Sequence, residues 1–279
     1  MTTLTTQVPR SSILPEFMIR PMFAANLFLL SIFIFSLPFV AYAIFMGMGF
    51  LVTGDSVHPF LQTGREGYYD FALYALAAHM VSGAFINLLA PLQIHLGLTQ
   101  KNKKWHRYLG GAVIAVSFSA AIVGTVFYAF YPDNTGERLM NSPSNLQAGS
   151  LFGVTMFIVA YKVVQTLIQR DFQEHRIWAV SLFVLAIGSY TSRVSDGWER
   201  LYFSAFGGSA DLRTYVMVAT AWAFWLVPLA GVHGYYALKR RGAFANVPAT
   251  TPLIASLIGV GFYGIGTYSY FVSMLSRML

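Results

Sequence analysis

Seven long apolar runs constrain this chain more than any other feature of its sequence. Each run is long enough to cross the hydrocarbon core of a membrane, which takes about 20 helical residues. Closed β-barrels also satisfy backbone hydrogen bonds in lipid, but barrels need short alternating strands, whereas these runs are apolar all round. The chain is therefore predicted to be all-α, a polytopic bundle of transmembrane helices.

The apolar runs also predict how the chain is divided. Residues 1–21 are expected to form a cytoplasmic N-terminal segment, and residues 22–279 a single transmembrane domain. We expect a central core of four to five helices from spans two to six, with span seven as a peripheral addition. The predicted spans are Met22–Val52, Asp70–Leu98, Trp105–Tyr131, Ser144–Arg170, His175–Phe203, Arg213–Arg240 and Pro252–Ser276.

Composition supports a membrane protein and excludes several other classes. Apolar residues make up 56% of the chain and charged residues only 10%, against roughly 25% charged residues in soluble domains. The net charge of +7 does not indicate a nucleic-acid partner, because the basic residues sit in short loops between spans. The expected partner is the lipid bilayer, together with other membrane subunits if the protein belongs to a complex. The chain has no cysteine, which excludes thiolate metal sites and thiol catalysis.

The loops predict the orientation in the membrane. Basic residues concentrate at the N-terminus and after spans two, four and six, whereas the opposite loops hold most of the acidic residues. Because positively charged loops stay inside, the N-terminus is predicted to be cytoplasmic and the C-terminus to lie outside.

Helical periodicity places polar residues on interior faces. In span two His79, Gly83, Gln93 and Gly97 share one face with Ser82, and in span three a stripe runs through His106, Gly110, Ser117 and Gly124. Small and polar residues are typical of helix–helix contacts in membranes.

An outer cluster is predicted from His79, Arg193 and Tyr190. An ionisable side chain within a span is costly and usually faces a cavity or a partner. His79 could pass protons or ligate haem iron, and Arg193 could hold a propionate, a quinone oxygen or an anionic substrate. The alternative is structural: an interhelical hydrogen bond for His79, and an ion pair of Arg193 with Asp196 or Glu199.

An inner cluster is predicted where the helices meet the cytoplasmic side. His106 and His175 begin their helices at similar depth on non-adjacent spans, and they are the candidate haem ligands. The alternative interpretation is that both simply anchor helix ends at the lipid interface. The members of this cluster are Gln93, His106, Arg107, His175, Arg176 and His233.

Two motifs carry a resemblance to a bacterial family. The first combines His79, Pro91-Leu92-Gln93, a lysine-rich turn and His106-Arg107-Tyr108-Leu109-Gly110; the second combines His175-Arg176-Ile177-Trp178 with Arg193. With these motifs the chain resembles a family of predicted bacterial polytopic membrane proteins of unknown function, over a core of about residues 70–203. Ala90 departs from the glycine that commonly precedes Pro-Leu-Gln. The resemblance implies a multi-pass protein of the bacterial inner membrane and supplies no activity.

Two functions follow as hypotheses, and the sequence leaves open whether the protein is an enzyme. The first is a redox or electron-transfer protein that binds haem b or quinone in its helix core. The second is a non-redox membrane protein without a cofactor: a proton or small-molecule transporter, or an accessory subunit of a larger complex. No inverted repeat supports a secondary transporter. No His-Glu-x-x-His motif or intramembrane Ser-His pair supports a hydrolase.

Overall fold

The computed structural model describes residues 21–54, 70–100, 102–130, 143–244, 247–248 and 250–275. Residues 1–20, and with them nearly all of the predicted N-terminal segment, lie outside this range. Every regular element of the described residues is an α-helix, which confirms the predicted all-α class. The helices are α1 (Pro21–Thr53), α2 (Asp70–Thr99), α3 (Lys103–Phe130), α4 (Pro143–Ile168), α5 (Phe172–Ala186), α6 (Gly188–Phe206), α7 (Ala210–Arg240) and α8 (Thr251–Leu275).

These helices make the protein an integral multi-pass membrane protein. Six of them, all except α5 and α6, are long and apolar enough to cross a membrane singly. The bent pair α5–α6 passes the same test as a unit and gives a seventh span. The predicted number of spans is therefore reached only if this pair counts as one.

The fifth predicted span, His175–Phe203, is not one continuous helix. The chain bends by 48° between α5 and α6, and Ile187 has left the helical conformation, with φ −82° and ψ 2°. Gly188 and Ser189 follow immediately, and a Gly/Ser pair is a known site of sharp kinks. A side chain at position 188 would also meet the Phe152 ring at 3.1 Å, so the bend occurs where another helix presses closely.

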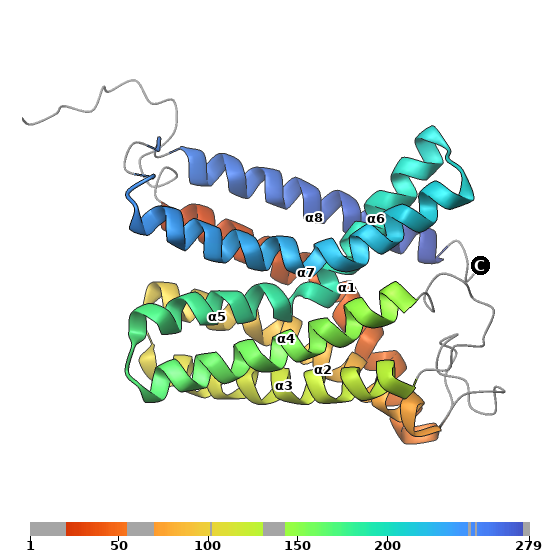
Figure 1. Cartoon of the computed structure of the whole chain (residues 1–279), viewed down its shortest axis with the longest axis horizontal. Coiled ribbons are helices and arrows are strands. Elements are labelled where there is room, and N and C mark those ends of the chain that lie inside the picture. The colour runs from red at the N-terminus through yellow and green to blue at the C-terminus, as the bar shows by residue number, and fades with distance from the viewer. Residues whose placement is uncertain are drawn as a thin grey trace, which may run out of the picture.

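The bend carries the chain from one group of helices to another. Figure 1 shows α2, α3, α4 and α5 lying along one side of the bundle and α7 and α8 along the other, with α1 running from the side of α7 and α8 across to α2. Before the bend α5 packs on α4, α7 and α2, whereas after it α6 packs mainly on α8 and also on α7. Helix α1 joins the two groups because it contacts both α2 and α8.

Helix α8 is part of the packed bundle, so the prediction that the last span is peripheral is wrong. It packs against both α6 and α1. At Gly197 of α6 an added Cβ would lie 1.9 Å from the backbone oxygen of Gly266 in α8, so glycine is needed for this close approach. Helix α7 is the sparsely covered one, since Trp225 is its single buried residue.

Most charged side chains of the described residues lie toward one or the other end of the bundle. At one end, called here the basic end (left in Figure 1), α2, α4 and α7 finish and α3 and α5 begin. The opposite end holds the junction between α6 and α7. The basic residues at the basic end are Lys103, Lys104, Arg107, Arg170, Arg176, Lys239, Arg240 and Arg241.

Candidate functional site

Helices α2 and α3 pack through three contacts in which a polar side chain meets a glycine of the other helix. In each contact a Cβ added to the glycine would lie 2.7–3.1 Å from the polar side chain. In every contact the residue number from α2 and the residue number from α3 add up to the same total. A constant sum is what a fixed register between two antiparallel helices requires. The two polar faces predicted for spans two and three therefore meet. The pairs are His79 with Gly124, Gln93 with Gly110, and His106 with Gly97.

His79 is tied to α3 by a hydrogen bond. Its Nδ1 lies 3.0 Å from the backbone oxygen of Ala120. Because a carbonyl only accepts, Nδ1 must carry a proton, and a neutral His79 then keeps the lone pair on Nε2. The structural alternative for His79, an interhelical hydrogen bond, is thus present, and it fixes which ring nitrogen remains available.

Two polar residues near the middle of α2 and α3, Asn87 in α2 and Ser117 in α3, are completely buried. Asn87 donates from Nδ2 to the backbone oxygen of Gly83 at 2.8 Å, but its Oδ1 has no hydrogen-bond partner. Ser117 Oγ also has none. The α2–α3 register places Ser117 at the level of Asn87, so two unpartnered oxygens occur at one depth.

The interface continues to the basic end with Gln93 and His106. Gln93 Oε1 and His106 Nδ1 are buried without hydrogen-bond partners. Five such side-chain atoms occur among the described residues, and four of them belong to α2 or α3. The fifth is Trp225 Nε1 in α7.

We call His79, Asn87, Ser117, Gln93 and His106 the polar seam. From the level of His79 to that of Gly97, which contacts His106, the seam is about 27 Å long at about 1.5 Å per residue. A hydrocarbon core is about 30 Å thick. The seam is therefore nearly as long as a hydrocarbon core is thick.

Sequence reasoning left Asn87 out of the site and did not assign Ser117 a role. Asn87 lies about 80° around α2 from His79, counting 100° per residue, so it fell outside the predicted face. An amide within an apolar span is itself costly, and that fact could have identified it.

At the opposite end Arg193 lies near His79. The two side chains are within range of an electrostatic interaction, and Ser189, one turn before Arg193, places its Oγ 3.8 Å from the Cβ position of Gly83. Arg193 Nη1 pairs with Asp196 Oδ2 at 3.2 Å, and the Arg193 side chain is 42% exposed. The predicted alternative for Arg193, an ion pair with Asp196, is therefore present as well.

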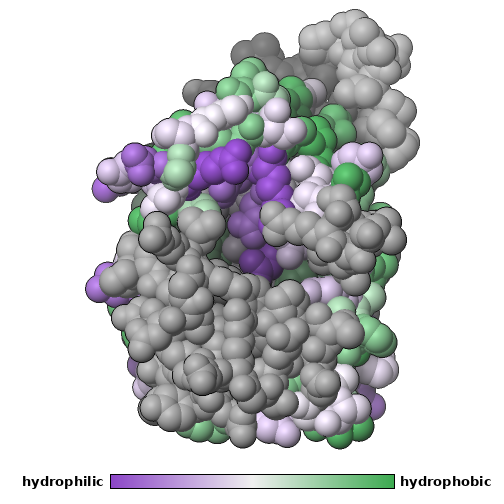
Figure 2. Space-filling model, turned by 90° about the vertical axis from the view of Figure 1, so that its right-hand side faces the viewer, coloured by the Kyte–Doolittle hydropathy of each residue, from purple (hydrophilic) through white to green (hydrophobic). Residues whose placement is uncertain are grey.

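The end of the bundle that contains α6 and α7 carries charged side chains. Figure 2 shows hydrophilic side chains gathered on the described part of this face. The charged residues that α6 and the first turn of α7 contribute at this end are Arg193, Asp196, Glu199, Arg200, Asp211 and Arg213.

Tyr190, the third predicted member of the outer cluster, forms its side-chain hydrogen bond with α8. Its hydroxyl lies 2.6 Å from Thr267 Oγ1 of α8, and its ring stacks on Tyr263 at 5.5 Å between centroids. Its side chain is 1% exposed. These contacts give Tyr190 a role in joining α6 to α8.

The histidines of the predicted inner cluster make contacts in three different helix pairs. His106 faces Gly97 of α2. His175 Nδ1 donates to the backbone oxygen of Val163 in α4 at 3.2 Å. His233 Nε2 lies 3.2 Å from Ser181 Oγ in α5, where its ring also meets Trp178 edge-on at 5.1 Å.

The two arginines of that cluster lie at the surface. Arg107 is exposed at the start of α3, and Arg176 lines a pocket between α5 and α7. None of the contacts described above joins one predicted inner-cluster residue to another. The described residues also contain no group of three or more His, Asp or Glu side chains that could hold a metal ion.

No family model, curated protein or solved structure matches this chain. The fold and the membrane-spanning helices are therefore known from the structure alone. The resemblance of the histidine motifs to a bacterial membrane-protein family remains a resemblance.

Proposed function

We propose that the protein conducts protons across its membrane along the polar seam between α2 and α3. The observation that carries the proposal is the set of four buried polar atoms of the seam that lack hydrogen-bond partners. A buried polar group without a partner costs about 1–3 kcal/mol. Such groups are usually satisfied by internal water where space allows. Water held along the seam would satisfy all four atoms and provide a hydrogen-bonded chain.

The spacing of the seam suits such a chain. Counted along α2, the steps from His79 to Asn87, to Gln93 and to the level of His106 are about 12, 9 and 6 Å. Hydrogen-bonded oxygens lie about 2.8 Å apart, so a few waters bridge each step. A histidine stands at each end, and histidine is the side chain whose charge changes near neutral pH. Its unprotonated Nε2 would let His79 accept a proton from a water molecule on the side of Arg193.

Proton flux into liposomes tests the proposal. The purified protein is reconstituted with a pH-sensitive dye inside, and a potassium diffusion potential drives protons inward. We expect flux well above protein-free liposomes, and a loss of about a hundredfold in His79→Ala, because positioned proton-transfer groups commonly contribute that much or more. His95→Ala is the matched control, since His95 is also in α2 but bonds Asn26 of α1 at 2.9 Å, outside the seam.

A substitution in the middle of the seam separates conduction from packing. Asn87→Leu keeps a similar side-chain volume and removes the unpartnered Oδ1. The substitution also removes the Nδ2 hydrogen bond to the Gly83 oxygen, but leucine leaves no side-chain polar atom buried without a partner, so we expect stability close to that of the wild-type protein together with lost flux. A variant that conducts like the wild-type protein would contradict a conducting seam, as would equal losses in His79→Ala and His95→Ala.

A redox function is the second candidate, and one observation favours it. His79 and His175 both donate from Nδ1 to a backbone carbonyl, the arrangement that leaves Nε2 free to bind iron and orients the ring. Haem b or a quinone would supply electron transfer, with Arg193 as the donor for a quinone oxygen and the His79 Nε2 lone pair as an acceptor for a quinol hydroxyl. The absorption spectrum of protein purified from haem-replete cells tests this: a Soret band lost in His175→Ala supports haem, and a spectrum without visible bands contradicts it.

A further inference from the structure

A pocket lies at the basic end between the start of α5 and the end of α7. Its volume is about 490 Å³. Helix α5 supplies Phe172, Gln173, Arg176 and Ile177, and α7 supplies Tyr236, Lys239 and Arg240. The pocket is separate from the polar seam, because neither α2 nor α3 contributes to it.

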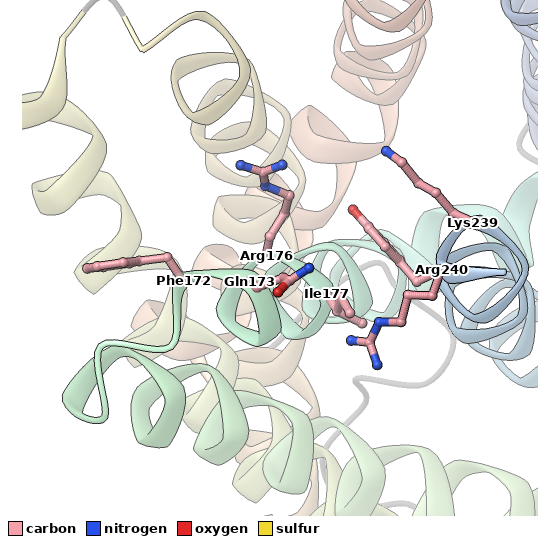
Figure 3. Close-up of a pocket in the computed structure, with 7 residues that line it drawn as sticks. Phe172, Gln173, Arg176, Ile177, Lys239 and Arg240 are labelled. Carbon is pink, nitrogen blue, oxygen red and sulfur yellow. The ribbon is translucent and has the colours of Figure 1, made fainter. Parts of the chain in front are cut away.

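The lining is strongly basic. Arg240 forms an ion pair with Glu174. Arg176 and Lys239 have no carboxylate within ion-pair distance in the part of the chain that the structure describes. Figure 3 shows both side chains extending to the same side of the pocket, Arg176 from α5 and Lys239 from α7, while Arg240 extends to the other side. The arrangement leaves two uncompensated cations facing one space.

The surroundings of the pocket are apolar and exposed. Phe172, which lines it, is 64% exposed, and Ile168, just before the turn into α5, is 75% exposed. Leu238 lies one residue before Lys239 and is also exposed. Exposed apolar side chains beside cations at helix ends are what the boundary between acyl chains and headgroups favours.

We infer that this pocket binds the phosphate group of an anionic phospholipid, with the acyl chains lying against the apolar surface beside Phe172 and Ile168. The planar guanidinium of Arg176 suits two phosphate oxygens at once, and Lys239 adds a point charge. Basic pockets between transmembrane helices bind anionic headgroups in this way. A free phosphate would use the same cations but would gain nothing from the apolar surface.

Lipid binding by the full chain in detergent tests the inference. Native mass spectrometry compares phosphatidylglycerol with phosphatidylcholine, and inorganic phosphate is added as a competitor. We expect phosphatidylglycerol to bind more tightly, and Arg176→Gln with Lys239→Gln to weaken it at least tenfold, because each cation near an anionic surface contributes a factor of roughly five. Lys103→Gln with Lys104→Gln is the matched control, since it removes the same charge from exposed residues of the same end, outside the pocket.

Each outcome bears on the inference. Weakening confined to the pocket variant supports it. Equal weakening of phosphatidylglycerol binding in both double variants would show that the lipid is attracted to the basic surface in general, and would overturn the inference. Equal binding of the two lipids would overturn it as well. Displacement of the lipid by millimolar inorganic phosphate would assign the pocket to free phosphate instead. Circular dichroism checks folding, and if the double variant does not fold, Lys239→Gln alone, at an exposed position, gives the same comparison against Lys103→Gln.

Discussion

The substitution Gly124→Ala tests the packing of the polar seam. The new Cβ would lie 2.7 Å from His79 Nδ1 and 2.9 Å from Cε1, closer than carbon and nitrogen can approach. The ring must therefore move, and its 3.0 Å bond to the Ala120 oxygen is lost. A buried hydrogen bond lost with one group left unsatisfied costs about 1–3 kcal/mol, and alanine returns about 1 kcal/mol of helix propensity relative to glycine. The expected net loss in the free energy of unfolding relative to the wild-type protein is therefore about 0–2 kcal/mol, and relative to a variant that gains only the helix propensity it is about 1–3 kcal/mol.

Unfolding in detergent micelles, followed by loss of the helical circular dichroism signal, measures this difference. Gly111→Ala is the matched control, because no heavy atom lies within 4 Å of its Cβ position. We expect this control to be as stable as the wild-type protein or slightly more stable. If Gly124→Ala unfolds at the same denaturant concentration as Gly111→Ala, the His79 ring is not held against α3 as described, and the reasoning fails.

Two further predictions concern the contact between α6 and α8. Gly197→Ala is expected to lower the free energy of unfolding by about 3 kcal/mol or more, because its Cβ meets the backbone oxygen of Gly266 and overpacking of this kind cannot be relieved by a side-chain rotation. Gly261→Ala, which meets nothing within 4 Å, should leave unfolding unchanged, and equal effects would contradict the close approach. Tyr190→Phe is expected to cost about 1 kcal/mol, and combining it with Thr267→Val should add little in a double-mutant cycle. Fully additive losses would mean that the 2.6 Å hydrogen bond contributes nothing.

The membrane helices could be predicted from the sequence because lipid imposes one simple requirement, an apolar run of sufficient length. Helical phase also predicted that α2 and α3 each have an interior polar face, but not that these two faces would pack against each other. The bend at Ile187 was missed because the apolar pattern continues through it. The Gly188-Ser189 pair inside the span was the available local indication.

The rest depended on tertiary packing, which sequence periodicity does not contain. The place of α8 in the bundle follows from the close approach of Gly197 and Gly266, two glycines far apart in sequence. Tyr190 was grouped with His79 from its depth, whereas its hydroxyl bonds α8. Depth along a helix could be estimated from the rise per residue, but the direction of a side chain beyond a bend could not.

The most direct test of a conducting seam asks whether water reaches its buried middle. The chain has no cysteine, so Ser117→Cys introduces a single thiol at a position with 0% exposure. Ser36→Cys is the control, because Ser36 is equally buried in α1 but bonds the Phe33 oxygen and lies outside the seam. With the protein in liposomes, a small water-soluble methanethiosulfonate is expected to modify the thiol at position 117 and not the one at position 36. Two equally unreactive thiols would mean that the seam is dry, and that result would contradict proton conduction along it.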